Sequence, residues 1–215
     1  MGWSPRGDDE IVPLSTLIEQ FRLEDVSHSP AFFDVKKLTH MNGEYVRALS
    51  HEEFIKASAP WVCPWQSAWR PLDREPSWRE DQFSAALYAR VASIVQERVA
   101  TLGEIPAMVE FFFLDEARVD EASFAKVIAD DPLGPTILEN AIRRYELLTT
   151  WDAPTLHAAT VELGEGLGLA LRKAQAPIRC AVTGTLIGPP LFESLEFLGR
   201  KKTVQRLRVA AARCA

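Results

Sequence analysis

Apolar residues recur along this chain at the spacing of an α-helix, and almost no stretch alternates between apolar and polar residues. Leu14, Leu17, Ile18 and Phe21 lie at positions i, i+3, i+4 and i+7, which places them on one helical face. Similar spacing and turn signals predict further helices over residues 34–49, 78–97, 108–113, 121–129, 135–149, 153–166, 177–184, 191–199 and 201–213. The pattern therefore predicts an all-α fold.

Capping residues mark where several of these helices begin. Asp34 is placed to cap the helix over 34–49. Both Ser50–Glu53 and Ser77–Glu80 match the capping box, in which a hydroxyl and a carboxylate satisfy free backbone amides and so open a helix. Gly43 lies inside a predicted helix, where glycine costs roughly 1 kcal/mol relative to alanine, so we expect a close packing contact there.

A proline-broken connector rich in tryptophan lies between the two capping boxes. It contains Trp61, Trp65 and Trp69, together with Arg70 and Arg74. Aromatic rings interleaved with arginines can stack on exposed nucleic-acid bases. Such rings also hold one helical layer against the next, which is the more common role. Both interpretations stay open from the sequence.

The composition is that of a globular protein with a sizeable core. The 215 residues are 47% hydrophobic and 25% charged. No apolar run approaches the roughly 18 residues that a membrane span needs, and the first residues lack the apolar region of a secretory signal. The three cysteines, Cys63, Cys180 and Cys214, are odd in number and far apart. We therefore expect a cytoplasmic protein with reduced thiols and no membrane partner.

The charge is distributed unevenly along the chain. The net charge is −6, but residues 171–215 hold nine Lys and Arg against two Glu, a net +7, which leaves −13 for residues 1–170. Such asymmetry is one mark of a surface that binds a polyanion. A cationic last helix can also simply suit its own dipole.

The motifs of catalytic and metal sites are missing. None of the four histidines lies within four positions of another histidine or of a cysteine, so the spacing of metal ligands is absent. The glycines at 164, 166 and 168 follow a helical pattern rather than a strand, which argues against a dinucleotide loop. We expect no catalytic residue, no metal and no cofactor in this chain.

Two sequence blocks resemble bacterial glutamyl-tRNA synthetases. Residues 29–38 (SPAFFDVKKL) and 41–47 (MNGEYVR) are similar to the stem-contact helices that follow the catalytic domain of those enzymes. Residues 176–184 (APIRCAVTG) and 188–193 (GPPLFE) are similar to their anticodon-binding end. The opening Gly2-Trp3-Ser4 is also similar to a segment after their ATP-binding lysine signature. The resemblance is collinear over essentially the whole chain.

The resemblance implies an elongated helical stem-contact subdomain over residues 1–60. An α-helical-cage anticodon-binding domain would follow, in two subdomains over 61–118 and 119–215. Arg98 would then face the third anticodon base, while Arg179 and the turn of Gly188, Pro189 and Leu191 would face the first two. Leu191 is expected to offer an apolar platform. Unpaired bases can be splayed out and read by arginine forks, which fits these assignments.

Further tRNA contacts are implied at both ends of the chain. Asn42, Tyr45 and Arg47 lie near one helical turn and would touch the tRNA backbone at the inner corner of the L, although the spacing of Tyr45 also suits the core. Lys201 and Lys202 are expected on a solvated helix, where they would contact backbone phosphates. An arginine at position 98 favours an enzyme that discriminates tRNA-Glu from tRNA-Gln.

The catalytic half of the family is not found in this sequence, because neither a His-x-Gly-His-like nor a Lys-x-Ser-Lys signature occurs. The resemblance therefore implies a module that binds tRNA-Glu, with the synthetase's catalytic domain as its partner. The parent enzyme would use ATP and Mg, and this chain alone would not catalyse. The alternative hypothesis is a stand-alone helical protein-interaction module that has lost tRNA binding.

Overall fold

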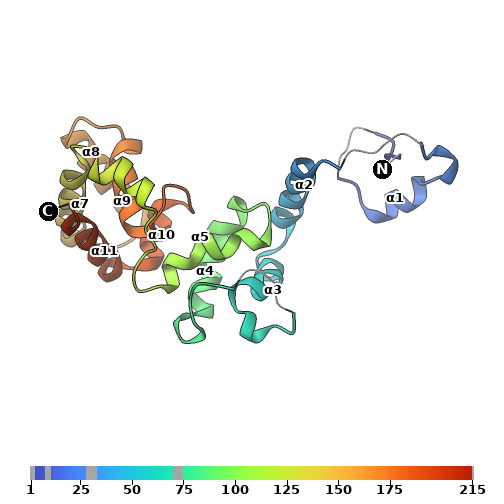
Figure 1. Cartoon of the computed structure of the whole chain (residues 1–215), viewed down its shortest axis with the longest axis horizontal. Coiled ribbons are helices and arrows are strands. Elements are labelled where there is room, and N and C mark those ends of the chain that lie inside the picture. The colour runs from blue at the N-terminus through green and yellow to red at the C-terminus, as the bar shows by residue number, and fades with distance from the viewer. Residues whose placement is uncertain (1–2, 8–10, 28–32, 70–74, 215) are drawn as a thin grey trace.

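The structure is a computed structural model that describes residues 3–7, 11–27, 33–69 and 75–214. Within these ranges it holds eleven α-helices and no strand, so the all-α prediction is confirmed. The helices are α1 (Leu14–Gln20), α2 (Val35–Ala48), α3 (His51–Val62), α4 (Ala85–Val95), α5 (Ile105–Phe113), α6 (Glu121–Phe124), α7 (Gly134–Leu147), α8 (Ala153–Gly166), α9 (Leu171–Thr183), α10 (Leu191–Leu198) and α11 (Arg200–Ala212). Figure 1 shows an elongated arrangement, with α1 at one end and α7 to α11 gathered at the other.

Some sequence features fall outside the described residues. They are Gly2, residues 29–32 of the first sequence block, and Arg70 and Arg74 of the tryptophan-rich connector.

Two of the three predicted helix starts are confirmed. The Asp34 side chain accepts hydrogen bonds from the amides of Lys36 and Lys37, and Ser50 and Glu53 form the full capping box. The predicted box at Ser77 is wrong, because the Ser77 hydroxyl donates to Glu110 Oε2 at 2.7 Å instead.

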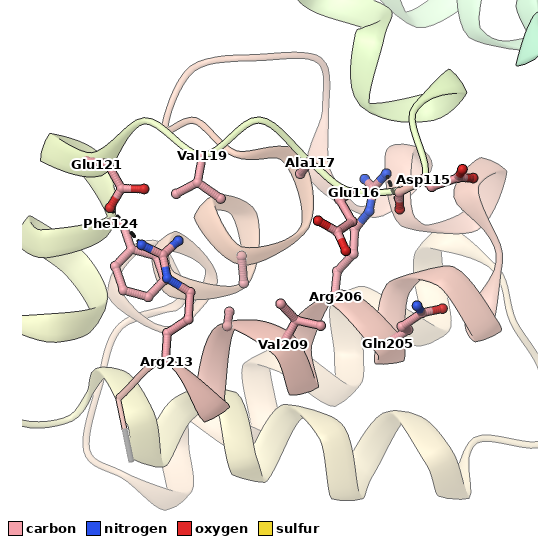
Figure 2. A pocket seen from close by; sticks show the side chains of 12 residues that line it. Asp115, Glu116, Ala117, Val119, Glu121, Phe124, Gln205, Arg206, Val209 and Arg213 are labelled. Carbon is pink, nitrogen blue, oxygen red and sulfur yellow. Dashed lines mark hydrogen bonds and ion pairs between the residues drawn. The ribbon is translucent and has the colours of Figure 1, made fainter. Parts of the chain in front are cut away.

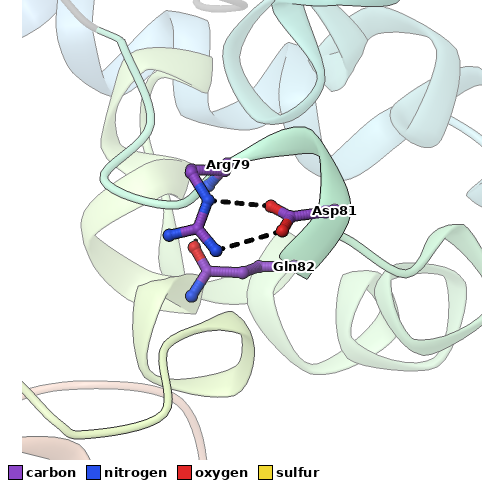
Figure 3. Close-up of polar contacts among 3 residues, drawn as sticks. All are labelled: Arg79, Asp81 and Gln82. Atoms are coloured by element: carbon purple, nitrogen blue, oxygen red, sulfur yellow. Dashed lines mark hydrogen bonds and ion pairs between the residues drawn. The ribbon is translucent and has the colours of Figure 1, made fainter.

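The chain after Ser77 makes a short turn before α4 begins. The Arg79 guanidinium forms a two-bonded pair with the Asp81 carboxylate (Figure 3). The backbone amide of Arg79 donates to Gln82 Oε1. Ser84 then caps the start of α4, because its hydroxyl accepts a hydrogen bond from the Leu87 amide. The helix predicted over 78–97 is therefore shorter, at Ala85–Val95.

The first core packs α2 and α3 against α4 and α5. Its fully buried side chains include Phe54, Val91 and Ile105. Trp78, which follows the connector, donates from Nε1 to the Val62 carbonyl at 3.1 Å. One connector tryptophan, Trp65, joins this layer and packs edge-on against Phe83. The contact of Trp65 supports the structural role for the connector's aromatic rings.

The second core is made by α6 to α11. Tyr145, Leu156, Ile178 and Leu207 are fully buried in it. Helix α6 continues as a π-helix over Ala125–Ala129. Helix α9 begins at Leu171 and runs through Pro177, so the helix predicted over 177–184 is longer than expected.

The two cores meet where α10 packs against α4. The Arg90 guanidinium of α4 lies 4.5 Å from the ring centre of Phe197 and 3.8 Å from Glu196 of α10. Nearby, Arg206 of α11 donates to the carbonyls at the ends of α5 and α9. The expected boundary between residues 118 and 119 lies between the cores, and the one at residue 60 lies within α3. Both boundaries remain predictions.

Helix α1 contributes nothing to either core. It has no buried residue, and Leu14 and Ile18 of its predicted apolar face are largely exposed. Among the described residues, no helix combines the length and apolar character that crossing a membrane requires.

Candidate nucleic-acid interface

The loop from α9 to α10 is held in one shape by its own polar groups. Gly184 ends α9 with φ +84°, a left-handed conformation that favours glycine. The Thr183 hydroxyl donates to the carbonyls of Arg179 and Thr185, and the Thr185 hydroxyl donates to the Ile187 carbonyl. The turn of Gly188, Pro189 and Pro190 then leads directly into α10. The loop is thus a rigid edge beside α9.

Arg179 lies against this edge. Its Nη1 donates to the Pro189 carbonyl at 2.8 Å, and the side chain is half-buried. Burial lowers the pKa of Arg179, the positive charge of Arg98 lowers it further, and the carboxylate of Glu193 acts in the opposite direction. Arg98 and Arg179, 81 positions apart in the sequence, are therefore brought close enough for their charges to repel each other.

Arg98 is exposed on a short 3-10 turn, Gln96–Arg98, that follows α4. The turn is fixed by buried Gln96, whose Nε2 donates to the carbonyls of Val46 and Leu49 at 2.9 and 2.7 Å. These carbonyls lie at the C-terminal end of α2, where the last backbone oxygens can still accept further hydrogen bonds. Arg98 is thus held at the point where α2 and α4 join.

Asn42 and Gly43 of α2 also contact the segment that follows Arg98. Asn42 Nδ2 donates to the Ala100 carbonyl at 2.5 Å, so its amide supports the protein backbone. A Cβ on Gly43 would lie 3.4 Å from Ala100 Cα, which confirms the expected close packing. The structure thus brings Asn42, one of the expected stem contacts, next to the segment that carries Arg98.

The other two residues expected at the stem have different surroundings. Tyr45 is 54% exposed, so it does not belong to the core. Arg47 is half-buried and forms an ion pair with Glu44 one turn earlier in α2.

Two expectations about the C-terminal residues need correction. Leu191 is only 3% exposed and belongs to the second core, so its side chain offers no apolar platform. Lys202 is half-buried and donates to the Phe112 carbonyl at 3.3 Å, because α11 packs against the end of α5; burial also lowers its pKa. Only Lys201 of the two lysines lies on open surface.

The structure also reveals residues that the sequence did not single out. Ile187, next to the Gly188 turn, is 81% exposed and places an apolar side chain beside the edge where Arg179 lies. Gln96 is a buried polar residue whose partners lie nearly 50 positions away. No local sequence signal predicts either exposure or such a distant contact.

A separate hollow of about 290 Å³ lies between α11 and the segment before α6. Figure 2 shows Arg206 and Arg213 of α11 facing Asp115, Glu116 and Glu121 there. Arg213 pairs with Glu121 at 2.7 Å, so cations and carboxylates compensate each other in this hollow. The part of the chain that the structure describes contains no group of three or more residues that could hold a metal ion.

Comparison with known proteins identifies the fold. The family model of the anticodon binding domain matches residues 53–211. The glutamate–tRNA ligase of Frankia alni is 49% identical over 99% of this chain and 42% of its own length, and that of Salinispora arenicola is 46% identical over 99% and 44%. The chain spans about two fifths of the length of these curated relatives.

A solved structure agrees with this result. The crystal structure of a glutamate tRNA ligase from Elizabethkingia meningosepticum matches 100% of this chain and 39% of that one, with a TM-score of 0.77 at 23% identity. At that identity the match concerns the fold alone. The family model covers most of the chain, so the resemblance read from the sequence blocks is confirmed, and the chain belongs to the anticodon binding domain family found in glutamate–tRNA ligases.

Proposed function

We propose that this chain recognises the anticodon and stem of tRNA-Glu as part of a glutamate–tRNA ligase. The observation that carries the proposal is the position of Arg179, which donates to the Pro189 carbonyl at the rigid edge and lies near enough to Arg98 for the two positive charges to interact. Two guanidinium groups that repel each other gain from a shared anionic or hydrogen-bond-accepting ligand, and splayed RNA bases supply such acceptors.

The roles of the individual residues follow from their positions. Arg98 would read the third anticodon base, while Arg179 and the backbone of Gly188, Pro189 and Leu191 would meet the first two. The exposed Ile187 supplies the apolar contact that the buried Leu191 side chain does not offer. Tyr45, Arg47 and Lys201 would contact the sugar–phosphate backbone, and Asn42 would act by holding the segment of Arg98.

The remaining steps of the reaction would belong to the rest of a longer protein. In this proposal, ATP and Mg are used by a catalytic domain outside the chain, and that domain is its structural partner. The apolar side chains that α1 and the start of α2 leave exposed, among them Leu14, Ile18 and Val35, would pack against it. The family match over residues 53–211 does not favour the alternative of a protein-interaction module without tRNA binding.

Binding titrations with Arg179 variants test the proposal. We expect Arg179→Ala to weaken binding of tRNA-Glu by about 1–3 kcal/mol, the usual worth of a two-bonded base contact, or roughly 5- to 150-fold in Kd. Arg179→Lys should lose almost as much, because a lysine keeps the charge but not the planar fork.

The matched control is Arg143→Ala, which removes one exposed cation from α7 that is paired with Glu139. It should leave binding nearly unchanged. The effect of Arg179→Ala should shrink on a tRNA whose first two anticodon bases are replaced, since a base contact is specific and a phosphate contact is not. Equal losses on both tRNAs would contradict a base-reading role.

A further inference from the structure

The basic residues of the second core's helices differ in what compensates their charge. Four pair with carboxylates, namely Arg143, Arg144, Arg208 and Arg213. Four donate to backbone carbonyls, namely Arg179, Arg200, Lys202 and Arg206. Within the described residues, this leaves the side chains of four cations without a hydrogen-bond or ion-pair partner, namely Lys126, Arg172, Lys173 and Lys201.

Three of these four uncompensated cations line the same groove. Lys126, Arg172 and Lys173 border a hollow of about 530 Å³ whose lining also includes Arg179, and we call it the basic groove. The one carboxylate in its lining, Asp131, accepts a hydrogen bond from the Leu133 amide through Oδ1. The basic groove therefore carries a net positive charge and is continuous with the edge where Arg179 lies.

The position of two of these cations opposes the stability of α9. Arg172 and Lys173 occupy its first turn, where the helix dipole is positive and a cation is unfavourable. The residue before the helix, Ala170, offers no side-chain cap. An anion bound in the basic groove would compensate both the two cations and the positive end of the helix dipole.

The spacing along α9 suits the backbone phosphates of a few stacked nucleotides. Arg172, Ala176 and Arg179 lie at i, i+4 and i+7, on one face of the helix. Seven residues at 1.5 Å each separate Arg172 from Arg179 by about 10 Å along the axis. That is the rise of about three stacked nucleotides at roughly 3.4 Å each.

We infer that the basic groove binds the RNA backbone phosphates next to the bases read at Arg179. The inference rests on the proposed function and extends it, because it adds Lys126, Arg172 and Lys173 as contacts that position the anticodon loop without reading its sequence. Apolar lining residues such as Val127 and Leu186 would lie under the sugars.

The test is the salt dependence of tRNA binding to the full chain. Kd is measured over a range of NaCl concentrations for the wild type, for Arg172→Ala/Lys173→Ala, and for Arg143→Ala/Arg144→Ala. The last is the matched control, since it also removes two adjacent cations, here ones paired with Glu139 and Glu162 on the surface. Each variant is titrated with tRNA-Glu and with the same tRNA carrying a replaced anticodon.

We expect the Arg172→Ala/Lys173→Ala variant to flatten the slope of log K against log salt by about 1.4, at roughly 0.7 for each phosphate of a single strand that is no longer neutralised. The decrease in affinity should be equal on both tRNAs, so the preference for the cognate anticodon stays. The control should keep the wild-type slope. The variant should also melt no lower than the wild type, because it removes two cations that oppose the dipole of α9.

The outcomes separate the inference from the proposed function. If the Arg172→Ala/Lys173→Ala variant keeps the wild-type slope while the wild type prefers its cognate anticodon, the basic groove is overturned and the proposed function stays intact. If the variant flattens the slope but the wild type shows no anticodon preference, the groove is supported and base reading is overturned. A chain that binds neither tRNA would overturn both.

Discussion

Arg206 joins the two cores of the molecule through hydrogen bonds to backbone carbonyls. Its Nη2 donates to the carbonyls of Phe111 and Leu114 at 2.8 Å each, and its Nη1 donates to the Val182 carbonyl at 2.7 Å. These oxygens lie at the ends of α5 and α9, where the last backbone carbonyls lack helical partners. One buried guanidinium thus caps two helices that belong to different cores.

The cost of removing it follows from two opposing effects. Arg206→Met leaves three carbonyls without this donor, two of them buried and that of Leu114 partly buried, at about 1–3 kcal/mol each, or roughly 6 kcal/mol together. It also removes a buried charge: burial lowers the pKa of Arg206 from 12.5 to about 10. That decrease corresponds to about 3 kcal/mol, at roughly 1.4 kcal/mol per pKa unit. We therefore expect a net loss of about 3 kcal/mol in the free energy of unfolding.

Urea unfolding followed by far-ultraviolet circular dichroism measures this loss. Arg208→Met is the matched control, because Arg208 lies on the same helix but pairs with Glu146 on the surface, where such pairs contribute about 0–1 kcal/mol. A variant Arg206→Met as stable as the control would refute the reasoning, since it would mean that the three carbonyls find other partners.

Three further predictions concern a buried hydroxyl, acid stability and activity. Tyr145→Phe should lower the free energy of unfolding by about 1 kcal/mol, because it removes the 2.7 Å hydrogen bond to Thr160; an unchanged urea midpoint would contradict this. Hydrogen bonds from Thr155 lower the pKa of Asp152 below 3.8, so its contribution to stability is present above about pH 4 and is lost as the pH falls through the lowered value. Melting curves between about pH 2 and 6 should show a smaller acid-induced decrease in Tm for Asp152→Asn than for the wild type, and parallel decreases would argue against it. The purified chain should show no ATP–pyrophosphate exchange, and detectable exchange would place adenylate chemistry within it.

Local sequence signals predicted those features of the fold that depend on neighbouring residues. The cap of α3 could be read because Ser50 and Glu53 bond to each other's backbone. The similar pattern at Ser77 gave a wrong prediction of a helix start. The Ser77 hydroxyl donates instead to the carboxylate of Glu110, 33 positions away. Pro177 suggested a helix start, yet α9 continues through it with Ala174 and Pro177 both buried in the packed layer. In each failure a tertiary contact outweighed a local preference.

For the candidate site too, the sequence indicated individual residues, whereas tertiary packing determines how they are placed. Arg98 and Arg179 were chosen from their sequence blocks, but their convergence depends on the packing of α10 against α4, which no local pattern specifies. The basic helix α11 was expected to be solvated, whereas Lys202 and Arg206 turn inward to carbonyls of the first core. Composition shows how many cations a segment holds and leaves open which of them face the solvent.

We propose that this chain distinguishes anticodons through Arg98 and Arg179. The most direct test is the ratio of two dissociation constants, one for tRNA-Glu and one for the same tRNA with only the anticodon replaced. We predict that the wild-type chain binds tRNA-Glu at least about tenfold more tightly, a difference of about 1.4 kcal/mol, and that Arg98→Ala/Arg179→Ala brings the ratio close to one. Equal dissociation constants for the wild type would contradict the claim.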